Sequence, residues 1–334
     1  MNTIPTVKST SGLTRIFRQL NAIVRPLEFM ERRVKQYGDF YQVIFPDAPT
    51  VMTCNPQAIE EIFTASPDQF DVGRGNKMLS FLVGDNSLLL LDGKPHKRRR
   101  KLLMPPFHGE SLHRCSQQIV EITNKVSDGL EPNKPFKVRH LTQEITMRVI
   151  LSVVFGIDSG ERYDRLRELL TTLLDTFNNP LNSSLIFFPW LQKDWGKYSP
   201  WGKFLAIKQE IRALIFAEIK ERRKAIALNP AEYHDILSLL LMAKDEAGKG
   251  MSDQELHDEL ITLLFAGHET TATAIAWALY WIHHLPEVKT KLLAEIASLG
   301  ASPDPMAMPS ASSAIAKLPY LDAVCKETVR REAH

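Results

Sequence analysis

The stretch Ala266-Gly267-His268-Glu269-Thr270-Thr271 lies inside the longest apolar pattern of the chain and decides the interpretation of the fold. The pattern begins at Ser252-Asp253-Gln254-Glu255, a capping box, and continues to Pro286. A helix of about 32 residues would be about 48 Å long at the usual rise. Because apolar residues lie on most of its faces, we predict a central, buried helix. A membrane span is disfavoured, since a carboxylate at its centre costs about 3 kcal/mol in a bilayer.

The chemistry of this stretch is unusual for a helix core. Gly267 costs roughly 1 kcal/mol relative to alanine, and Glu269 is an expensive buried charge unless it is hydrated or paired. The Thr270 hydroxyl can bond the carbonyl of Ala266, which can bend or open a helix. Ala266 and Gly267 leave room for a flat ligand, so an acid and a hydroxyl beside them suit proton delivery. The alternative is a packing glycine beside ordinary threonines, with Glu269 in solvent.

The remaining pattern predicts a mainly α protein with a small β-sheet element. Residues 39–45 and 50–54 are expected to form two short strands, and Asn55 with Pro56 should start a helix. Residues 70–91 contain glycines and few regular periods, so a long loop is expected there. Helices are expected at residues 95–104, 141–155, 164–177, 201–225, 235–243, 286–300 and 319–334. The pattern lacks the strand–helix alternation of a parallel-sheet nucleotide fold.

The charge and cysteine content favour a cytoplasmic protein. The net charge is +2, although residues 97–101 form a run of five cations, for most of which a solvated basic face is the simplest interpretation. Three scattered cysteines give no disulfide framework. Arginines interrupt the N-terminal apolar run, so no secretory signal is expected. An apolar stripe at residues 13–24 is expected to pack on the protein body, with contact to a membrane surface as the alternative.

Four motifs in order resemble the cytochrome P450 family over nearly the whole chain. The long helix with its Ala-Gly-x-Glu-Thr-Thr stretch is similar to the family's oxygen-binding helix. The other three motifs are Asp92-Gly93-Lys94-Pro95-His96 with Arg100 and Leu102-Leu103-Met104-Pro105-Pro106-Phe107, residues 146–156 ending in Val154-Phe155-Gly156, and Leu318-Pro319-Tyr320-Leu321 leading to Glu327-Thr328-Val329-Arg330. Among the members of this family, the chain most resembles a soluble bacterial one, and a cyanobacterial type is one candidate.

The resemblance implies roles for particular residues. His96 and Arg100 share a helix face and would bind the haem propionates. Glu269 and Thr270 would be the acid–alcohol pair of catalysis.

Two further sets of residues complete the implied site. Ala266 and Gly267 would lie against the haem. Glu327 and Arg330 would form a structural ion pair, for which an ordinary surface salt bridge is the alternative.

The family's iron ligand is missing from the pattern. The family binds iron through a cysteine in a Phe-x-x-Gly-x-Arg-x-Cys-x-Gly loop, and none of Cys54, Cys115 and Cys325 lies in such a loop. No metal ligand is therefore predicted within the chain. We expect residues 1–334 to form one cytochrome P450-like domain that lacks its C-terminal haem–thiolate segment and is unstable alone.

The implied function is a monooxygenase, or hydroxylase, that uses haem, dioxygen and electrons originating from NAD(P)H. A ferredoxin or flavodoxin-type donor is the expected partner, steered by the basic run. Residues 70–91 and 187–198 correspond to the substrate pocket and are apolar, which favours a fatty acid or terpene. The alternative is a non-catalytic binding remnant of the same scaffold. A nucleic-acid-binding protein is disfavoured, because a single basic run in a chain of near-zero net charge provides too little positive surface for the phosphate backbone.

Overall fold

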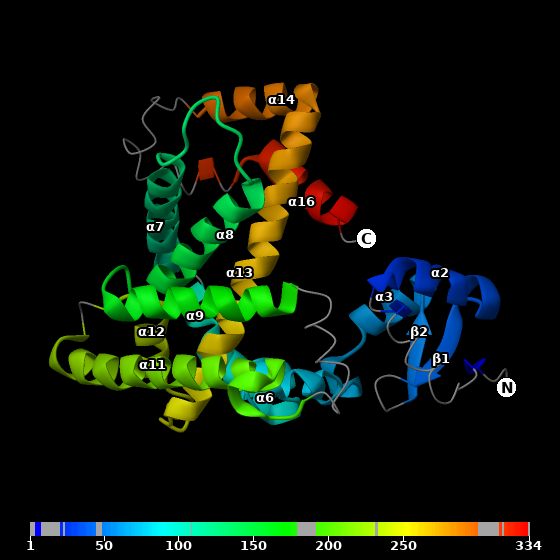
Figure 1. The fold of residues 1–334 in the computed structure, drawn as a ribbon, viewed down its shortest axis with the longest axis horizontal. Helices are drawn as coiled ribbons and strands as arrows, with labels where there is room; N and C mark the ends of the chain where they lie inside the picture. The colour runs from blue at the N-terminus through cyan, green and yellow to red at the C-terminus, as the bar shows by residue number, and fades with distance from the viewer. Residues whose placement is uncertain are drawn as a thin grey trace. The chain divides into compact units, whose positions relative to one another are not determined.

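The computed structural model describes residues 4–7, 21–22, 24–44, 49–107, 109–178, 192–230, 233–299, 314–315 and 317–332 (Figure 1). The chain divides into two compact units, each treated separately below. One contains residues 1–71 and 169–211, and the other contains residues 72–168 and 212–334. The boundary between the units falls within two helices, α9 (Glu161–Asn178) and α11 (Pro200–Leu228).

The first unit contains the small sheet. Strands β1 (Phe40–Ile44) and β2 (Pro49–Thr53) pair antiparallel, with Phe40 opposite Thr53. The helix α2 (Pro26–Tyr37) precedes them, and α3 (Pro56–Thr64) and the 3₁₀ turn η1 (Pro67–Gln69) follow. Asn55 caps α3 by accepting a hydrogen bond from the Ala58 N–H at 3.0 Å. The predicted strand pair and the predicted cap are confirmed.

The second unit is helical in the residues described. Its N-terminal elements are α4 (Val72–Gly75), η2 (Asn76–Leu79), α5 (Ser80–Val83), η3 (Leu88–Leu90), α6 (Gly93–Leu103), η4 (Pro105–Phe107), α7 (Gly109–Ser127), α8 (Val138–Val149) and the π-helix η5 (Ile150–Val154). Its later elements are α12 (Ile236–Met242), α13 (Asp253–His284), α14 (Pro286–Ala297) and α16 (Pro319–Glu332).

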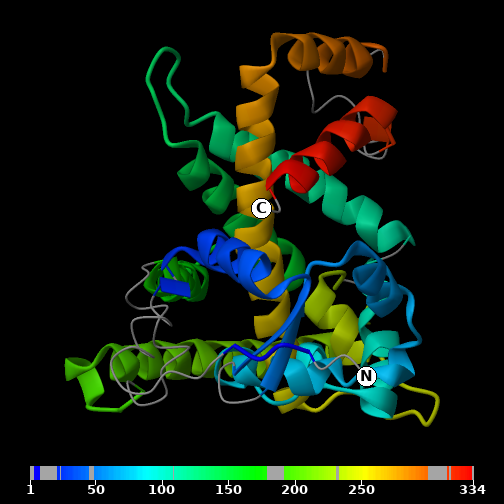
Figure 2. The same cartoon turned by 90° about the vertical axis from the view of Figure 1, so that its right-hand side faces the viewer.

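Helix α13 forms the axis of this unit, as Figures 1 and 2 show. Its 32 residues begin at the predicted capping box, in which Ser252 and Glu255 bond each other's backbone N–H. It packs against α8, α12, α14 and α16. The prediction of a long central helix is therefore confirmed. The helix continues without a break through Ala266–Thr271, so the Thr270–Ala266 hydrogen bond does not interrupt it.

Other predictions need correction. Residues 70–91 are a series of short helical turns instead of an irregular loop, because the glycines there separate the turns without removing their hydrogen bonds. The core helix expected at residues 141–155 begins earlier, at Val138, and ends as a π-helix. The apolar stripe of residues 13–24 and most of the aromatic stretch of residues 187–198 lie outside the described residues, whereas Trp195 and Tyr198 are exposed.

Across the helices described, no segment is both long and apolar enough to cross a membrane.

Candidate functional site

The middle of α13 exposes one narrow face. Ala266 and Thr270 are four residues apart, so they lie on the same side of the helix, and both are exposed. The Thr270 hydroxyl donates a hydrogen bond to the Ala266 carbonyl, as the sequence predicted. Thr271 is also exposed. A small residue and a hydroxyl therefore lie together on a helix surface that a flat ligand could cover.

Gly267 lies on a different side of α13. A Cβ atom at this position would come within 2.9 Å of the Ile150 Cδ1, on the π-helix η5. The contact supports the alternative interpretation, in which this glycine permits close helix packing. Its role beside a ligand remains a prediction.

Glu269 is held by two side chains of α8. Its carboxylate forms an ion pair with Arg139 and accepts a hydrogen bond from the Gln143 Nε2 at 3.1 Å. Its side chain is 25 % exposed, so it can exchange protons with solvent. The adjacent His268 is buried, and its Nδ1 lies 3.6 Å from the Glu269 Oε2. Glu269 is therefore a positioned acid beside Thr270, instead of a free surface carboxylate.

His96 and Arg100 occupy one side of α6. His96 is half-buried and Arg100 is exposed. Neither side chain has a hydrogen-bond or ion-pair partner within the part of the chain that the structure describes. Two unpaired donors spaced by one helical turn can bind the carboxylates at the edge of a ligand.

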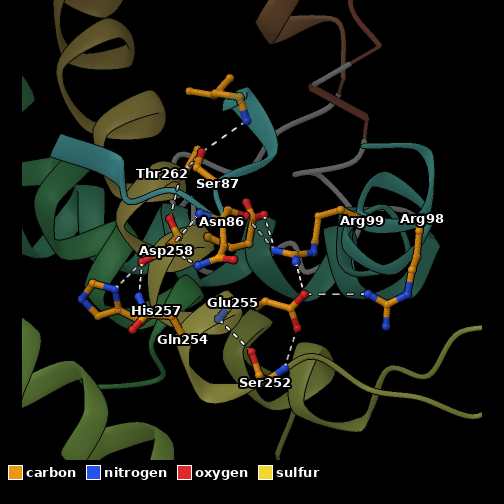
Figure 3. A network of polar contacts seen from close by, with 12 residues as sticks. Asn86, Ser87, Arg98, Arg99, Ser252, Gln254, Glu255, His257, Asp258 and Thr262 are labelled. Atoms are coloured by element: carbon orange, nitrogen blue, oxygen red, sulfur yellow. Dashed lines mark hydrogen bonds and ion pairs between the residues drawn. The ribbon is translucent and has the colours of Figure 1, made fainter. Parts of the chain in front are cut away.

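Arg99, which the sequence placed within a solvated basic face, is buried. Only 3 % of the residue is exposed. Its Nη1 donates to the Glu259 Oε1 at 2.8 Å and to the Asn86 carbonyl at 2.9 Å, and its Nη2 pairs with Glu255 (Figure 3). The prediction was wrong for this residue, because a cation can be buried when carboxylates and a carbonyl satisfy its charge and its two Nη groups, although the buried Arg99 Nε has no partner among the described residues.

A third carboxylate of α13, that of Asp258, extends the network in Figure 3. It accepts hydrogen bonds from the backbone and side chain of Asn86, at 3.0 and 2.9 Å, and lies 2.9 Å from the His257 Nδ1. The Thr262 hydroxyl donates to the Ser87 hydroxyl at 2.7 Å. The first turns of α13 therefore fix residues 86–87.

The carboxylates of the network titrate differently. Burial raises the pKa of Glu259 to about 7, although the Arg99 charge acts in the opposite direction. Partial burial also opposes ionisation of Glu255, but the Ser252 N–H and the Arg99 charge lower its pKa below the ordinary value. Burial likewise disfavours the Asp258 anion, but hydrogen bonds from His257 and Asn86 outweigh it and lower the pKa.

The Arg98 side chain also has hydrogen-bond partners. Its Nε donates to the Asp245 Oδ2 at 2.6 Å, and its Nη2 donates to the carbonyls of Lys249 and Gly250 at 3.3 and 3.4 Å. Arg98 therefore packs α6 against the α12–α13 connection, where Lys101 also pairs with Glu246 at 2.9 Å, and Arg99 packs α6 against α13 itself. One sequence signal could have indicated this: three acids, Glu255, Asp258 and Glu259, recur at helical spacing in an apolar helix.

Glu327 and Arg330 form the predicted ion pair. The Arg330 Nε and Nη2 donate to the two carboxylate oxygens at 2.6 and 2.7 Å, and Arg331 adds a third bond at 3.0 Å. These hydrogen bonds lower the pKa of Glu327 to about 2. The pair is exposed and screened by solvent, so by itself it contributes little to stability.

The cysteines of the chain do not fit an iron ligand. Burial raises the pKa of the Cys115 and Cys325 thiols, which favours the neutral thiol over the thiolate that binds metal. Among the described residues, no three metal-ligating side chains come together. The donors of α6 and the exposed face of α13, by contrast, fit the edge and the face of a haem.

Comparisons with known proteins identify the chains that this one is similar to. The family model described as Cytochrome P450 matches residues 13–333. "Putative cytochrome P450 135B1" of Mycobacterium tuberculosis is 35% identical over 305 residues, covering 91% of this chain and 61% of that protein. "Putative cytochrome P450 138" of Mycobacterium bovis is 32% identical over 283 residues, covering 84% and 62%. The chain thus spans about three fifths of the length of these relatives.

Solved structures show the same fold. A cyanobacterial CYP120A1 with bound retinoic acid superposes with a TM-score of 0.70 at 21% identity, covering 93% of this chain and 66% of that one. The cytochrome P450 CYP102L1 superposes with a TM-score of 0.69 at 23% identity, covering 91% and 65%.

Proposed function

Because this chain belongs to the cytochrome P450 family, we propose that it forms the oxygen-activating and propionate-binding parts of a haem monooxygenase that hydroxylates an apolar substrate. Two observations support the proposal: α13 has an open face at Ala266 and Thr270, and α6 carries two donors, His96 and Arg100, that have no partner among the described residues. A haem needs both: a flat, sterically open surface and hydrogen-bond donors at its carboxylate edge.

The residues have separate tasks in this proposal. When bound through a cysteine thiolate, haem supplies the iron chemistry that activates dioxygen. His96 and Arg100 hold its propionates, and Arg100 can do so bidentately. Glu269, held by Arg139 and Gln143, exchanges protons with solvent, and the Thr270 hydroxyl passes a proton across the exposed face of α13.

The axial cysteine of the proposed enzyme lies outside residues 1–334. The expected pattern is the family's Phe-x-x-Gly-x-Arg-x-Cys-x-Gly loop. Reading the gene downstream of the His334 codon tests this directly. An open frame that continues into such a loop supports the proposal, whereas an immediate stop codon favours the alternative of a non-catalytic binding remnant.

An apolar substrate, such as a fatty acid or terpene, is supported by two observations. The turns of residues 72–83 carry the apolar side chains of Met78, Leu79, Phe81 and Leu82. The structural neighbour CYP120A1 carries retinoic acid, a long apolar terpenoid with one carboxylate.

In this proposal, a ferredoxin or flavodoxin delivers the electrons. This donor is reduced in the cytoplasm with electrons from NAD(P)H. The side chains of α6 that remain exposed on the basic run are those of Lys97, Arg100 and Lys101. Arg98 and Arg99 are removed from this surface, because they pair with Asp245 and with Glu255 and Glu259.

Haem titration with optical detection separates the proposed enzyme from the remnant. The protein translated from the whole open frame should bind haem and give a thiolate-type spectrum. The double variant H96A/R100A should bind haem more weakly, while the exposed neighbour variant Lys101→Ala serves as the control and should bind normally. Absence of a thiolate-type spectrum in the unsubstituted protein would rule out the monooxygenase.

A further inference from the structure

The cation that joins α6 to α13 is the buried Arg99. Its guanidinium reaches Glu255 and Glu259 on α13 and the carbonyl of Asn86 before α6. Glu259 is 1 % exposed, so this contact is shielded from solvent and from salt. Asp258, the third acid of these turns, is engaged by Asn86 and His257 and does not compete for the guanidinium.

The position of this contact along α13 links it to the candidate site. Glu259 and Ala266 are seven residues apart, which is two helical turns, or about 10 Å along nearly the same face. Thr270 follows one turn later. Arg99 therefore anchors α6 on the same stripe of α13 that later becomes the exposed face.

The anchor also fixes how α6 is rotated. Arg99, Leu102 and Leu103 are its buried residues. His96, one turn before Arg99, borders this buried side, and Arg100 lies one residue, or about 100°, beyond it. If the guanidinium stays inside, both donors must lie off the buried side. Arg98 supports the same orientation through Asp245.

We infer that Arg99 is a positioning residue, which holds α6 against Glu255 and Glu259 so that His96 and Arg100 are presented beside the Ala266–Thr270 face of α13. The inference rests on the proposed function, because His96 and Arg100 matter as a pair only if they share one ligand with α13. Arg99 itself does not contact that ligand.

The test compares Arg99→Gln with a matched control, Arg222→Gln, by hydrogen exchange in the haem-free protein translated from the whole open frame. Arg222 is also a buried arginine, paired with Glu218 at 3.0 Å and with Asp235, the N-cap of α12, and it has no contact with an α6 residue among those described. Exchange of the α6 amides, residues 93–103, is measured relative to those of α16. We expect R99Q to accelerate α6 exchange roughly tenfold, the equivalent of 1.4 kcal/mol, and R222Q to leave the ratio unchanged.

A second readout uses the haem-loaded protein from the whole open frame. R99Q should release haem to an acceptor protein faster than R222Q, although both lose a buried ion pair. If R99Q does not fold, Arg99→Lys decides by the same criteria, because lysine keeps the charge but cannot reach all three partners at once. An unchanged α6 exchange ratio, or equal haem release in the two variants, overturns the inference. If the unsubstituted protein binds no haem, the proposed function fails, and α6 exchange alone decides the role of Arg99.

Discussion

Two segments of α13, one near its start and one at its middle, accommodate polar residues in a central helix in different ways. Near the start, every residue from Leu256 to Thr262 is buried, and Asp258 and Glu259 are matched by Asn86, His257 and Arg99. At the middle, Ala266, Thr270 and Thr271 are exposed, and Glu269 is only half-buried. The same helix therefore serves as a fixed anchor at its start and as an open surface at its centre.

The largest expected effect comes from breaking the anchor. Arg99→Ala leaves the buried Glu259 without its cation and Glu255 with only Arg98, at 3.8 Å, so we expect a loss of about 3–5 kcal/mol in the free energy of unfolding. Urea unfolding measures it. The comparison variant Thr271→Ala, on the open face, should stay within about 0.5 kcal/mol of the unsubstituted chain. Equal losses in the two variants would remove the distinction between the two segments.

The free energy of unfolding, measured over a series of pH values, tests the buried segment of α13 separately. The pKa of Glu259 is raised in the folded state, to about 7 from an ordinary 4.5. Its contribution to stability is therefore complete below pH 4.5 and is lost as the pH rises through 7. The change amounts to about 3 kcal/mol, at 1.36 kcal/mol per pKa unit. Glu259→Gln should remove this part of the pH dependence of unfolding, and an unchanged profile would contradict the account.

Gly267 tests the packing of the open segment against the π-helix. Gly267→Val should cost about 1–3 kcal/mol through overpacking against Ile150. Gly267→Ala should lie within about 1 kcal/mol of the unsubstituted chain, because its helix propensity offsets a clash with the flexible end of that isoleucine. Thermal unfolding distinguishes the two variants. Equal tolerance of valine and alanine would mean that close packing is not the reason for the glycine.

Thr270→Ala should have the smallest effect on folding and a specific effect on chemistry. The hydroxyl is exposed and bonds only its own helix, so stability should change by less than about 0.5 kcal/mol. In the proposed enzyme, the variant should still bind substrate. The electrons that it consumes should form hydrogen peroxide instead of hydroxylated product. Measuring peroxide per electron consumed checks this. Tight coupling in the variant would exclude Thr270 from proton transfer.

The sequence predicted the features that depend on local patterns. The capping box, the proline starts and the strand pair are set by neighbouring residues, and the structure confirms them. The burial of Arg99 could not be predicted in this way, because its partners lie 156 and 160 residues further along the chain. The same applies to Gly267, whose neighbour Ile150 comes from another helix. Arg139, which holds Glu269, lies 130 residues before it.

Cysteine accessibility at two alanines of α13 tests the central claim most directly. Ala266 is exposed and Ala272, six residues later, is fully buried. In a background whose native cysteines at 54, 115 and 325 are replaced by serine, Ala266→Cys should react rapidly with a small thiol reagent. Added haem should block this reaction. Ala272→Cys should react slowly with or without haem. An Ala266→Cys thiol whose reactivity haem leaves unchanged would contradict the assignment of this face as the haem site.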